Sequence, residues 1–269
     1  MRRFLRSAGA GVALLATTVV SSAGNDRIRV SAESVPAGST TTVPTETTVP
    51  APTTTSPPST VPPSTVPPST TTTVLRARDV RVLTRIPTKK RVVFITIDDG
   101  GFISDDLVAF LNRERIPVTS FVMPEPLLWQ IGKYRRIKRM TFENHSNTHG
   151  HMRRMTFAQQ KEEICRASRL VGRMARSRPV FFRPPGGDWN ETTRRAAAAC
   201  RIRYLVLWNV IADDRIIRMR SSHTLMPGDI ILMHYRKDLI PSLRWVMAQL
   251  RHDGLKPALM RDHVRYGRP

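Results

Sequence analysis

From about residue 80 to the C-terminus, two hydrophobic patterns alternate along the chain. Short runs rich in Val, Ile and Phe predict buried strands, and longer stretches with apolar residues three or four apart predict helices. Strands are expected at 91–98, 117–123, 179–182, 203–208, 229–233 and 256–260. Helices are expected at 105–114, 157–174, 191–200 and 241–251. This alternation indicates an α/β fold with a parallel sheet, open or closed as a barrel, whose chemistry lies at the carboxyl ends of the strands.

The first 79 residues follow a different pattern. A basic start, an apolar run from Ala8 to Val20 and the small residues Ser21 and Ala23 predict an export signal over residues 1–23. An uncleaved membrane anchor is the alternative. Residues 24–79 are rich in Ser, Thr and Pro and repeat PPSTV, which predicts a disordered linker because such a segment cannot bury enough apolar surface. Residues 80–269 are then expected to form one folded domain.

The charge of the chain bears on its binding partners rather than on its fold or chemistry. The chain has 43 Lys and Arg against 21 Asp and Glu, a net charge of +22. Such a surface favours contact with an anionic wall polymer or a membrane surface. Coding bias is the alternative, because Arg outnumbers Lys 36 to 7. No run reaches the roughly 20 apolar residues that a membrane-spanning helix needs, so a multi-pass membrane protein is excluded.

Two pairs of residues suit metal chemistry. Asp98 and Asp99 end the first long strand, where alternation points their side chains in different directions. His145 and His149 are four residues apart, which places both imidazoles on one face of a helical turn. With a strand-end carboxylate they form a two-histidine, one-carboxylate set with an open position, as in catalytic zinc sites. A turn and a chance pair of surface histidines are the simpler alternatives.

Three further motifs follow later strands. Arg183 begins RPPGG, whose prolines stiffen a loop and whose glycines let the backbone approach a ligand. Asp213 and Asp214 end another strand, and His234 ends the next in LMH. Each motif alone is compatible with a structural role. Because these three motifs and the two pairs above follow five separate strands, their coincidence favours one shared functional site.

The order TIDDG, HSNTH, RPPGG, IADDR and LMH resembles the polysaccharide deacetylase family, carbohydrate esterase family 4, with its NodB homology domain. The family pattern runs TFDDG, HSxxH or HTxxH, RxPxG, DxxDW and LxH. The resemblance covers roughly residues 90–260. Of the five motifs, the first, second, third and fifth match well. The fourth is degraded, because Ile211 and Arg215 replace its first acid and its Trp. The fold that this resemblance implies is a distorted, incomplete (β/α) barrel.

The resemblance also implies roles for the first three motifs. Asp99, His145 and His149 would bind one divalent metal, commonly zinc, with cobalt or nickel as alternatives. Asp98 matches the general base, and Arg183 matches the arginine that orients that base. A metal-activated water and a separate base suit amide hydrolysis at neutral pH.

The remaining motifs are assigned in the same way. His234 matches the general acid, which protonates the leaving amine, and Asp214 matches the acid that orients it. Pro185 and Gly186 lie in the loop whose backbone helps to bind the substrate oxygen. Leu232 matches a residue of the acetyl pocket. We expect an active enzyme with a changed acetyl pocket.

The implied reaction is the metal-dependent removal of acetyl groups from the N-acetylated sugars of a polysaccharide. The export signal and linker favour bacterial peptidoglycan as the substrate and a protein secreted to, or tethered at, the cell envelope. An acetyl esterase or chitin-type deacetylase acting on an external polysaccharide is one alternative, and a catalytically inactive wall-binding module is another. We expect a monomer. We also expect no nucleic-acid partner, because the sequence contains no nucleic-acid-binding motif.

The two cysteines and one basic segment lead to two further predictions. Cys165 and Cys200 lie on helices predicted on either side of the RPPGG strand, and an oxidising exterior favours a disulfide between them. Two buried free thiols are the alternative. The segment Lys133–Arg139 has five basic residues in seven, which predicts either an anion-facing patch or a solvated helix face.

Overall fold

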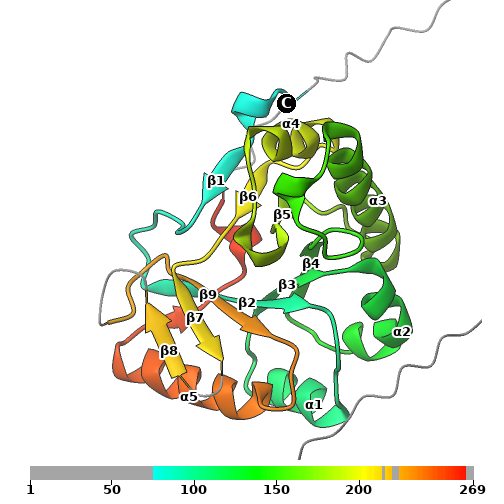
Figure 1. The fold of residues 1–269 in the computed structure, drawn as a ribbon. Coiled ribbons are helices and arrows are strands. Elements are labelled where there is room, and N and C mark those ends of the chain that lie inside the picture. The colour runs from blue at the N-terminus through cyan, green and yellow to red at the C-terminus, as the bar shows by residue number, and fades with distance from the viewer. Residues whose placement is uncertain (1–74, 214–215, 220–223, 265–269) are drawn as a thin grey trace, which may run out of the picture. The chain divides into compact units, whose positions relative to one another are not determined.

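The structure is a computed structural model that describes residues 75–213, 216–219 and 224–264. The expected signal segment, nearly all of the linker, and Asp214 lie outside these residues. Within them, ten strands form one sheet, connected by five α-helices and four short 3₁₀ helices (Figure 1). No helix of the described part has the length and apolar composition needed to cross a bilayer.

The sheet is almost entirely parallel. Its strand order is β1, β6, β5, β4, β3, β2, β9, β7 and β8, and β10 pairs with the start of β2. Only β7 and β8 are antiparallel. The strands are β1 (Arg81–Leu83), β2 (Val92–Asp99), β3 (Val118–Val122), β4 (Met140–Asn144), β5 (Phe181–Phe182), β6 (Tyr204–Val206), β7 (Val210–Asp213), β8 (Ile216–Met219), β9 (Ile230–His234) and β10 (Lys256–Pro257).

The sheet curls but does not close into a continuous barrel. The segment after β1 reaches the start of β9, where Ile86 N donates to Gly228 O at 2.9 Å and Arg85 forms an isolated bridge with Asp229. Gly228 is required at this approach, because it has φ +93° and an added Cβ would lie 2.2 Å from Ile86 O. The expected distorted, incomplete (β/α) barrel is confirmed.

Five α-helices connect the strands, and local signals predicted the ends of all but α2 to within about two residues. The helices are α1 (Asp105–Arg113), α2 (Pro124–Tyr134), α3 (Phe157–Ala175), α4 (Glu191–Ala199) and α5 (Leu239–His252), with 3₁₀ helices at η1 (Ala77–Asp79), η2 (Met152–Arg154), η3 (Pro185–Gly187) and η4 (Met260–Asp262). Ser104 caps α1 by accepting from Leu107 N at 3.1 Å. Thr156 and Gln159 form the expected capping box of α3.

Alternation along the central strands decides which side chains face the interior of the curl. On β2, Ile97 packs with residues of α1, α2 and α5, whereas Phe94 packs in a separate cluster inside the curl. Asp98 is four residues beyond Phe94 and shares its face. On the neighbouring β9, Met233 packs with the helices, so the adjacent His234 faces the interior. Asp98 and His234 are directly paired in the two strands, so both polar side chains meet at the same strand ends.

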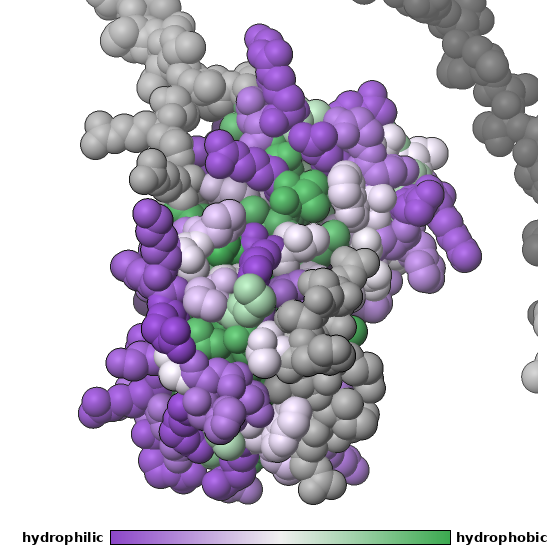
Figure 2. All heavy atoms as spheres, turned by 90° about the vertical axis from the view of Figure 1, so that its left-hand side faces the viewer, coloured by the Kyte–Doolittle hydropathy of each residue, from purple (hydrophilic) through white to green (hydrophobic). Residues whose placement is uncertain are grey.

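One face of the described part is largely hydrophilic at its periphery. Figure 2 views the side that carries β1 and β8, where hydrophilic side chains form most of the periphery and hydrophobic ones show between them. The basic segment Lys133–Arg139 is partly engaged in packing. Lys133 and Arg136 contact Asp105 of α1 at 3.4 and 2.7 Å, and Arg135 donates to Met174 O at 2.8 Å. These three charges hold α2 against its neighbours, which weakens the case for this segment as an anion-facing patch.

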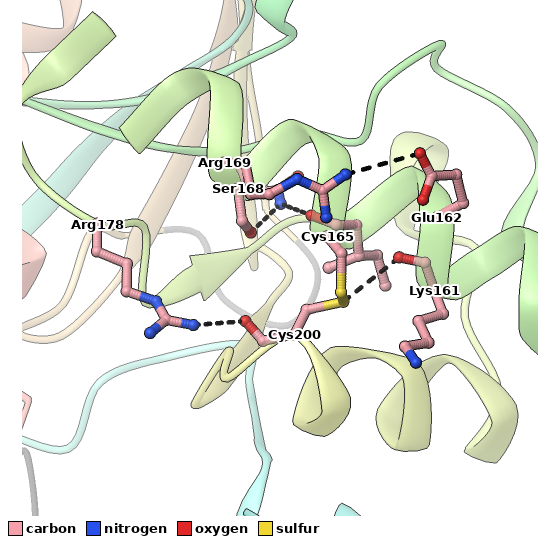
Figure 3. Close-up of a disulfide and its surroundings, with 9 residues drawn as sticks. Lys161, Glu162, Cys165, Ser168, Arg169, Arg178 and Cys200 are labelled. Atoms are coloured by element: carbon pink, nitrogen blue, oxygen red, sulfur yellow. Dashed lines mark hydrogen bonds and ion pairs between the residues drawn. A yellow bond between two sulfur atoms is a disulfide. The ribbon is translucent and has the colours of Figure 1, made fainter. Parts of the chain in front are cut away.

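The expected disulfide is present. Cys165 of α3 and Cys200, directly after α4, are bonded, with their Cα atoms 4.9 Å apart (Figure 3). The bridge joins two helices that pack against β5 and β6 through Phe182 and Leu205. It therefore ties together the helices that flank the Arg183 loop.

Removing this disulfide is expected to destabilise the protein. A bridge across 35 residues constrains the unfolded chain and stabilises the native state by about 3–4 kcal/mol on the chain-entropy model. Urea unfolding of the Cys165→Ser/Cys200→Ser variant should show a loss of this size relative to the oxidised protein. Wild type under reducing conditions is the matched control and should approach the variant. A loss below about 1 kcal/mol would contradict the prediction.

Candidate active site

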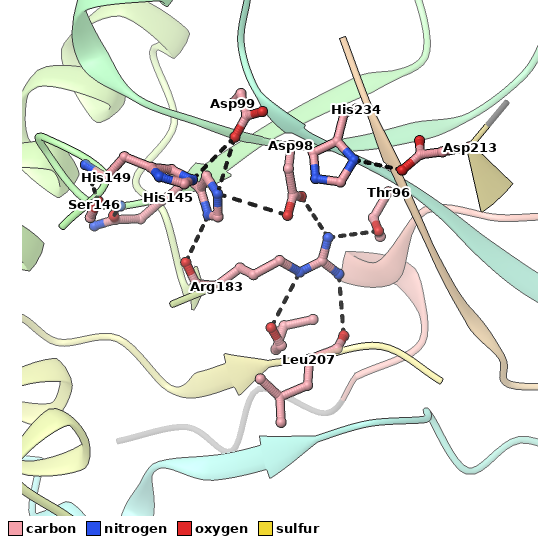
Figure 4. A network of polar contacts seen from close by, with 12 residues as sticks. Thr96, Asp98, Asp99, His145, Ser146, His149, Arg183, Leu207, Asp213 and His234 are labelled. Carbon is pink, nitrogen blue, oxygen red and sulfur yellow. Dashed lines mark hydrogen bonds and ion pairs between the residues drawn. The ribbon is translucent and has the colours of Figure 1, made fainter. Parts of the chain in front are cut away.

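Asp99, His145 and His149 converge beyond the carboxyl ends of β2 and β4 (Figure 4). Asp99 Oδ1 lies 3.4 Å from Nε2 of each histidine. The three ligand atoms lie within 4.8 Å of one another. Two imidazole nitrogens and one carboxylate oxygen fit a divalent ion such as Zn²⁺. These are the three residues that the sequence predicted as ligands.

The surroundings of the two histidines suit ligation. His145 Nδ1 lies 2.8 Å from Arg183 O, and because a carbonyl only accepts, Nδ1 carries the proton and Nε2 is free to bind. Burial and the neighbouring His145 lower the pKa of His149, which favours the neutral form that binds metals. Burial raises the pKa of Asp99, but its contacts with the histidines lower it below the usual range. The set therefore offers two imidazole nitrogens and one carboxylate oxygen to a metal ion.

The histidine loop is not the helical turn that the spacing predicted. Residues 145–149 form neither helix nor strand. Ser146 and His149 have φ of 69° and 62°, and Asp99 has φ of 79°, all in the left-handed region. Each such non-glycine residue costs about 1–3 kcal/mol and persists only where its surroundings hold it. Two left-handed residues, not helical periodicity, bring the imidazoles together.

Side chains beneath the loop hold this backbone in place. Asn144 Oδ1 accepts from Ser146 N at 2.8 Å, and Ser146 Oγ accepts from His149 N at 3.0 Å. Glu163 of α3 accepts from Asn147 N at 3.0 Å and Thr148 N at 2.8 Å through Oε2, and from the Thr148 hydroxyl at 3.0 Å through Oε1. Sequence reasoning missed Glu163, because its role depends on α3 packing under the loop.

Glu163→Gln is expected to weaken metal binding about 10- to 100-fold, as is typical when a partner that orients metal ligands is lost. The amide retains only one acceptor oxygen for three donors, so the loop carrying His149 loosens. Competition with a chelator of known affinity measures the effect. Glu162→Gln is the matched control, because Glu162 is exposed and, among the described residues, its carboxylate pairs with Arg169 alone, at 3.8 Å. Equal metal affinity in both variants would show that Glu163 does not position the ligands.

Asp98 occupies a buried position beside the metal ligands. Its Oδ1 accepts from Arg183 Nη1 at 2.6 Å, and its Oδ2 lies 3.8 Å from His145 Nε2. Arg183 is fully buried and also donates to Thr96 Oγ1 and to the carbonyl oxygens of Val206 and Leu207. One oxygen of Asp98 is therefore held by a fixed cation, and the other faces the metal ligands.

The acid beside His234 differs from the one expected. Asp213 Oδ2 lies 2.9 Å from His234 Nδ1, whereas the motif alignment assigned this contact to Asp214, which lies outside the described residues. Ile211 of β7 pairs with Leu232 of β9, so Asp213 and His234, two residues further along each strand, share a face. A one-residue shift along a strand reverses the face. We therefore assign to Asp213 the role that the alignment gave to Asp214.

Burial lowers the pKa of His234, but the hydrogen bond to Asp213 and the charges of Asp98 and Asp99 raise it above its usual value. His234 Nδ1 donates to the carboxylate of Asp213. The other ring nitrogen, Nε2, is not engaged by Asp213 and is available to a ligand. The site thus places one carboxylate and one imidazole of raised pKa beside the metal ligands.

The expected substrate-binding residues border this arrangement. Leu232 is buried two residues before His234, and Pro185 is buried in the turn that follows Arg183. Gly186, in the same turn, is exposed, and an added Cβ would meet nothing within 4 Å. The aromatic residue beside this turn is Trp208, whose ring would lie 3.2 Å from a Cβ at Gly187.

A groove of about 730 Å³ extends from the metal ligands between α2 and α3. His149 forms part of its wall, as do Trp129 and Leu128, which are 79% and 61% exposed. Arg166 and Arg173 line the same groove. A long ligand reaching the metal ligands has room to continue along it.

Comparison with known proteins identifies the domain. The polysaccharide deacetylase family model matches residues 85–205. Residues 85–205 carry a polysaccharide deacetylase domain. Within this range the domain contains the metal ligands, Asp98 and Arg183, and the rest of the described sheet adds Asp213 and His234.

Two curated proteins are similar to this chain in sequence. The chain is 34% identical over 154 residues to the uncharacterized protein SCO4760 of Streptomyces coelicolor, covering 56% of this chain and 62% of that protein. It is 34% identical over 96 residues to a bifunctional xylanase/xylan deacetylase of Cellvibrio japonicus, covering 34% of this chain and 14% of that enzyme. The chain thus spans less than two thirds of the length of either relative.

Solved structures share the fold of the deacetylase domain. The peptidoglycan N-acetylglucosamine deacetylase Bc1960 superposes with a TM-score of 0.60 at 18% identity, covering 68% of this chain and 92% of that chain. The wild-type pseudoenzyme BA3943 of Bacillus anthracis, from carbohydrate esterase family 4, superposes with a TM-score of 0.58 at 17% identity, covering 70% of each chain. The same fold therefore occurs with and without activity, so function has to be argued from the site.

Proposed function

We propose that this protein is a metal-dependent hydrolase that removes acetyl groups from the N-acetylated sugars of peptidoglycan. The observation that carries the proposal is the convergence of Asp99, His145 and His149 beside Asp98 and His234. A metal-ligand set, a carboxylate base and an imidazole acid are the groups that amide hydrolysis requires. When bound, a divalent ion supplies Lewis-acid polarisation of the acetyl carbonyl and makes water a usable nucleophile near neutral pH.

Asp98 accepts the proton of the attacking water. Its Oδ1 is held by the fully buried Arg183, which leaves Oδ2 as the proton acceptor on the side of the metal ligands. The fixed guanidinium stops the carboxylate from rotating away. Proximity and orientation of this kind are a large part of what a catalytic base contributes.

His234 donates a proton to the amine nitrogen as it leaves. An amine is a poor leaving group unless it is protonated, so a group other than the base must supply that proton. Asp213 fixes the tautomer with Nδ1 protonated and holds the charged form of the ring, so Nε2 carries the proton to be donated.

Peptidoglycan is proposed from three observations. The groove beside His149 has room for neighbouring sugars of a glycan strand, and Trp129 offers an exposed ring face within it. The signal-like segment and the Pro-rich linker of the sequence favour secretion to, or tethering at, the cell envelope. A fold relative, Bc1960, is a peptidoglycan N-acetylglucosamine deacetylase.

The decisive experiment is acetate release from purified acetylated peptidoglycan by the full chain. We expect release that stops with a chelator and returns when zinc, cobalt or nickel is added. A substrate panel with chitin oligosaccharides and acetylated xylan tests the alternative that a xylan-type relative suggests. Release from none of these substrates, with metal bound, would favour an inactive wall-binding module.

A further inference from the structure

A cavity of about 600 Å³ lies beside the disulfide, between α3 and the C-terminal end of α4. Cys165 and Cys200 lie in its wall, and Figure 3 shows Arg169 and Arg178 beside them. No Asp or Glu is among the described residues that line it. Five arginines do line it: Arg169, Arg173, Arg176, Arg178 and Arg201.

Few of these positive charges are neutralised. Arg169 lies 3.8 Å from Glu162, and both side chains are more than half exposed, so this pair is weak. Arg178 donates to the carbonyl oxygen of Cys200 at 3.0 Å. Arg173, Arg176 and Arg201 have no side-chain hydrogen bond or ion pair with any residue of the described ranges. Burial and the charges of Arg201 and Arg203 lower the pKa of Arg178, as expected where like charges are crowded.

The negative ends of two helices offset only part of this positive charge. Helices α3 and α4 both end at the cavity, and Arg176 and Arg201 adopt left-handed φ of 53° and 58° just beyond them. Each helix C-terminus is equivalent to about half a negative charge, so the two ends offset roughly one arginine. Glu162 offsets at most one more. Roughly three positive charges remain around one concave site.

We propose that this cavity binds phosphate groups of an anionic polymer. A guanidinium pairs with phosphate oxygens through two parallel hydrogen bonds, and successive phosphates along one strand can engage several of these arginines at once. A membrane surface fits less well, because none of the large exposed hydrophobic residues of the described part lines the cavity. Arg173 lines both this cavity and the groove that contains His149, so the two sites adjoin at this residue.

This inference does not depend on the proposed hydrolysis, and its test measures binding alone. Calorimetry with tripolyphosphate compares the full chain with the variant Arg176→Gln/Arg201→Gln. The matched control is Arg78→Gln/Arg115→Gln, which removes the same charge outside the cavity. Arg115, like the two cavity arginines, is exposed, lies just after a helix and has a left-handed φ of 52°. We expect the cavity pair to weaken binding about tenfold or more and the control pair less than about threefold.

Four further measurements make the outcome decisive: thermal melting, a second cavity variant, a carboxylate polymer and lipid vesicles. Thermal melting checks that each variant is folded, and Arg169→Gln/Arg173→Gln is a second cavity pair if the first is unstable. Equal weakening by the cavity and control pairs would overturn the site in favour of general surface charge. Tighter binding of polygalacturonate than of polyphosphate of equal charge would overturn the preference for phosphate. Binding only to phosphatidylglycerol vesicles, and not to tripolyphosphate, would overturn the polymer in favour of a lipid surface.

Discussion

Replacing either His145 or His149 with Ala is expected to remove stable metal binding and, with it, acetate release. Each histidine would supply one of the three candidate ligands found among the described residues, and a site that keeps two loses both affinity and geometry. Metal analysis after loading with zinc and dialysis should show occupancy reduced at least about tenfold relative to wild type. Acetate release should fall in parallel.

His151→Ala is the matched control for both variants. His151 lies two residues beyond His149, is exposed and is not part of the ligand set. Its replacement should leave metal content and turnover close to those of wild type. Full occupancy in both the His145 and His149 variants would rule out this ligand set. Loss of metal with unchanged acetate release would instead show that hydrolysis does not depend on the ion.

Asp213→Asn is expected to lower turnover by about 10²-fold or more while leaving metal content unchanged. Asp213 is the carboxylate that contacts His234, at 2.9 Å, and it takes no part in the metal-ligand set. The amide cannot hold the protonated imidazole in the same way, so less of the general acid is present in its active form. Steady-state kinetics and metal analysis of one preparation separate this effect from metal loss.

The pH profile of the same variant gives a second readout. His234 acts only when protonated, so activity is lost as pH rises through its pKa. Asp213 helps to raise that pKa, and Asp213→Asn should therefore move the alkaline limb of the profile to lower pH. A profile displaced to higher pH would contradict the assigned role.

Asp214→Asn is the internal control, because it makes the same chemical change one residue along the chain. In the pairing of β7 with β9, Asp213 shares a face with His234, and a shift of one residue along a strand reverses the face, so Asp213 rather than its neighbour is expected to serve His234. The substitution should change turnover less than about threefold. If Asp214→Asn has the larger effect, His234 is oriented by Asp214 in the active protein.

Local patterns in the sequence were sufficient for most of the elements. Strand β2, helix α1 and helix α3 begin and end within one or two residues of their predicted positions. These elements carry β-branched apolar runs, or a capping residue before an amphipathic stretch, and both signals act within one element. Helix α2 and strand β4 lacked such signals. Helix α2 contains a second proline and a non-helical residue at Gln130, and β4 is half polar.

The sequence by itself also indicated the candidate metal ligands and the candidate base, because each motif follows its own strand and parallel strands end at one edge. Only the tertiary structure decided which acid serves His234, since that depends on the register of β7 against β9. The left-handed histidine loop, with Glu163 beneath it, and the arginine cavity at the ends of α3 and α4 were likewise invisible in the sequence. Their residues are distant along the chain or act through backbone conformation, and neither relation leaves a periodic pattern.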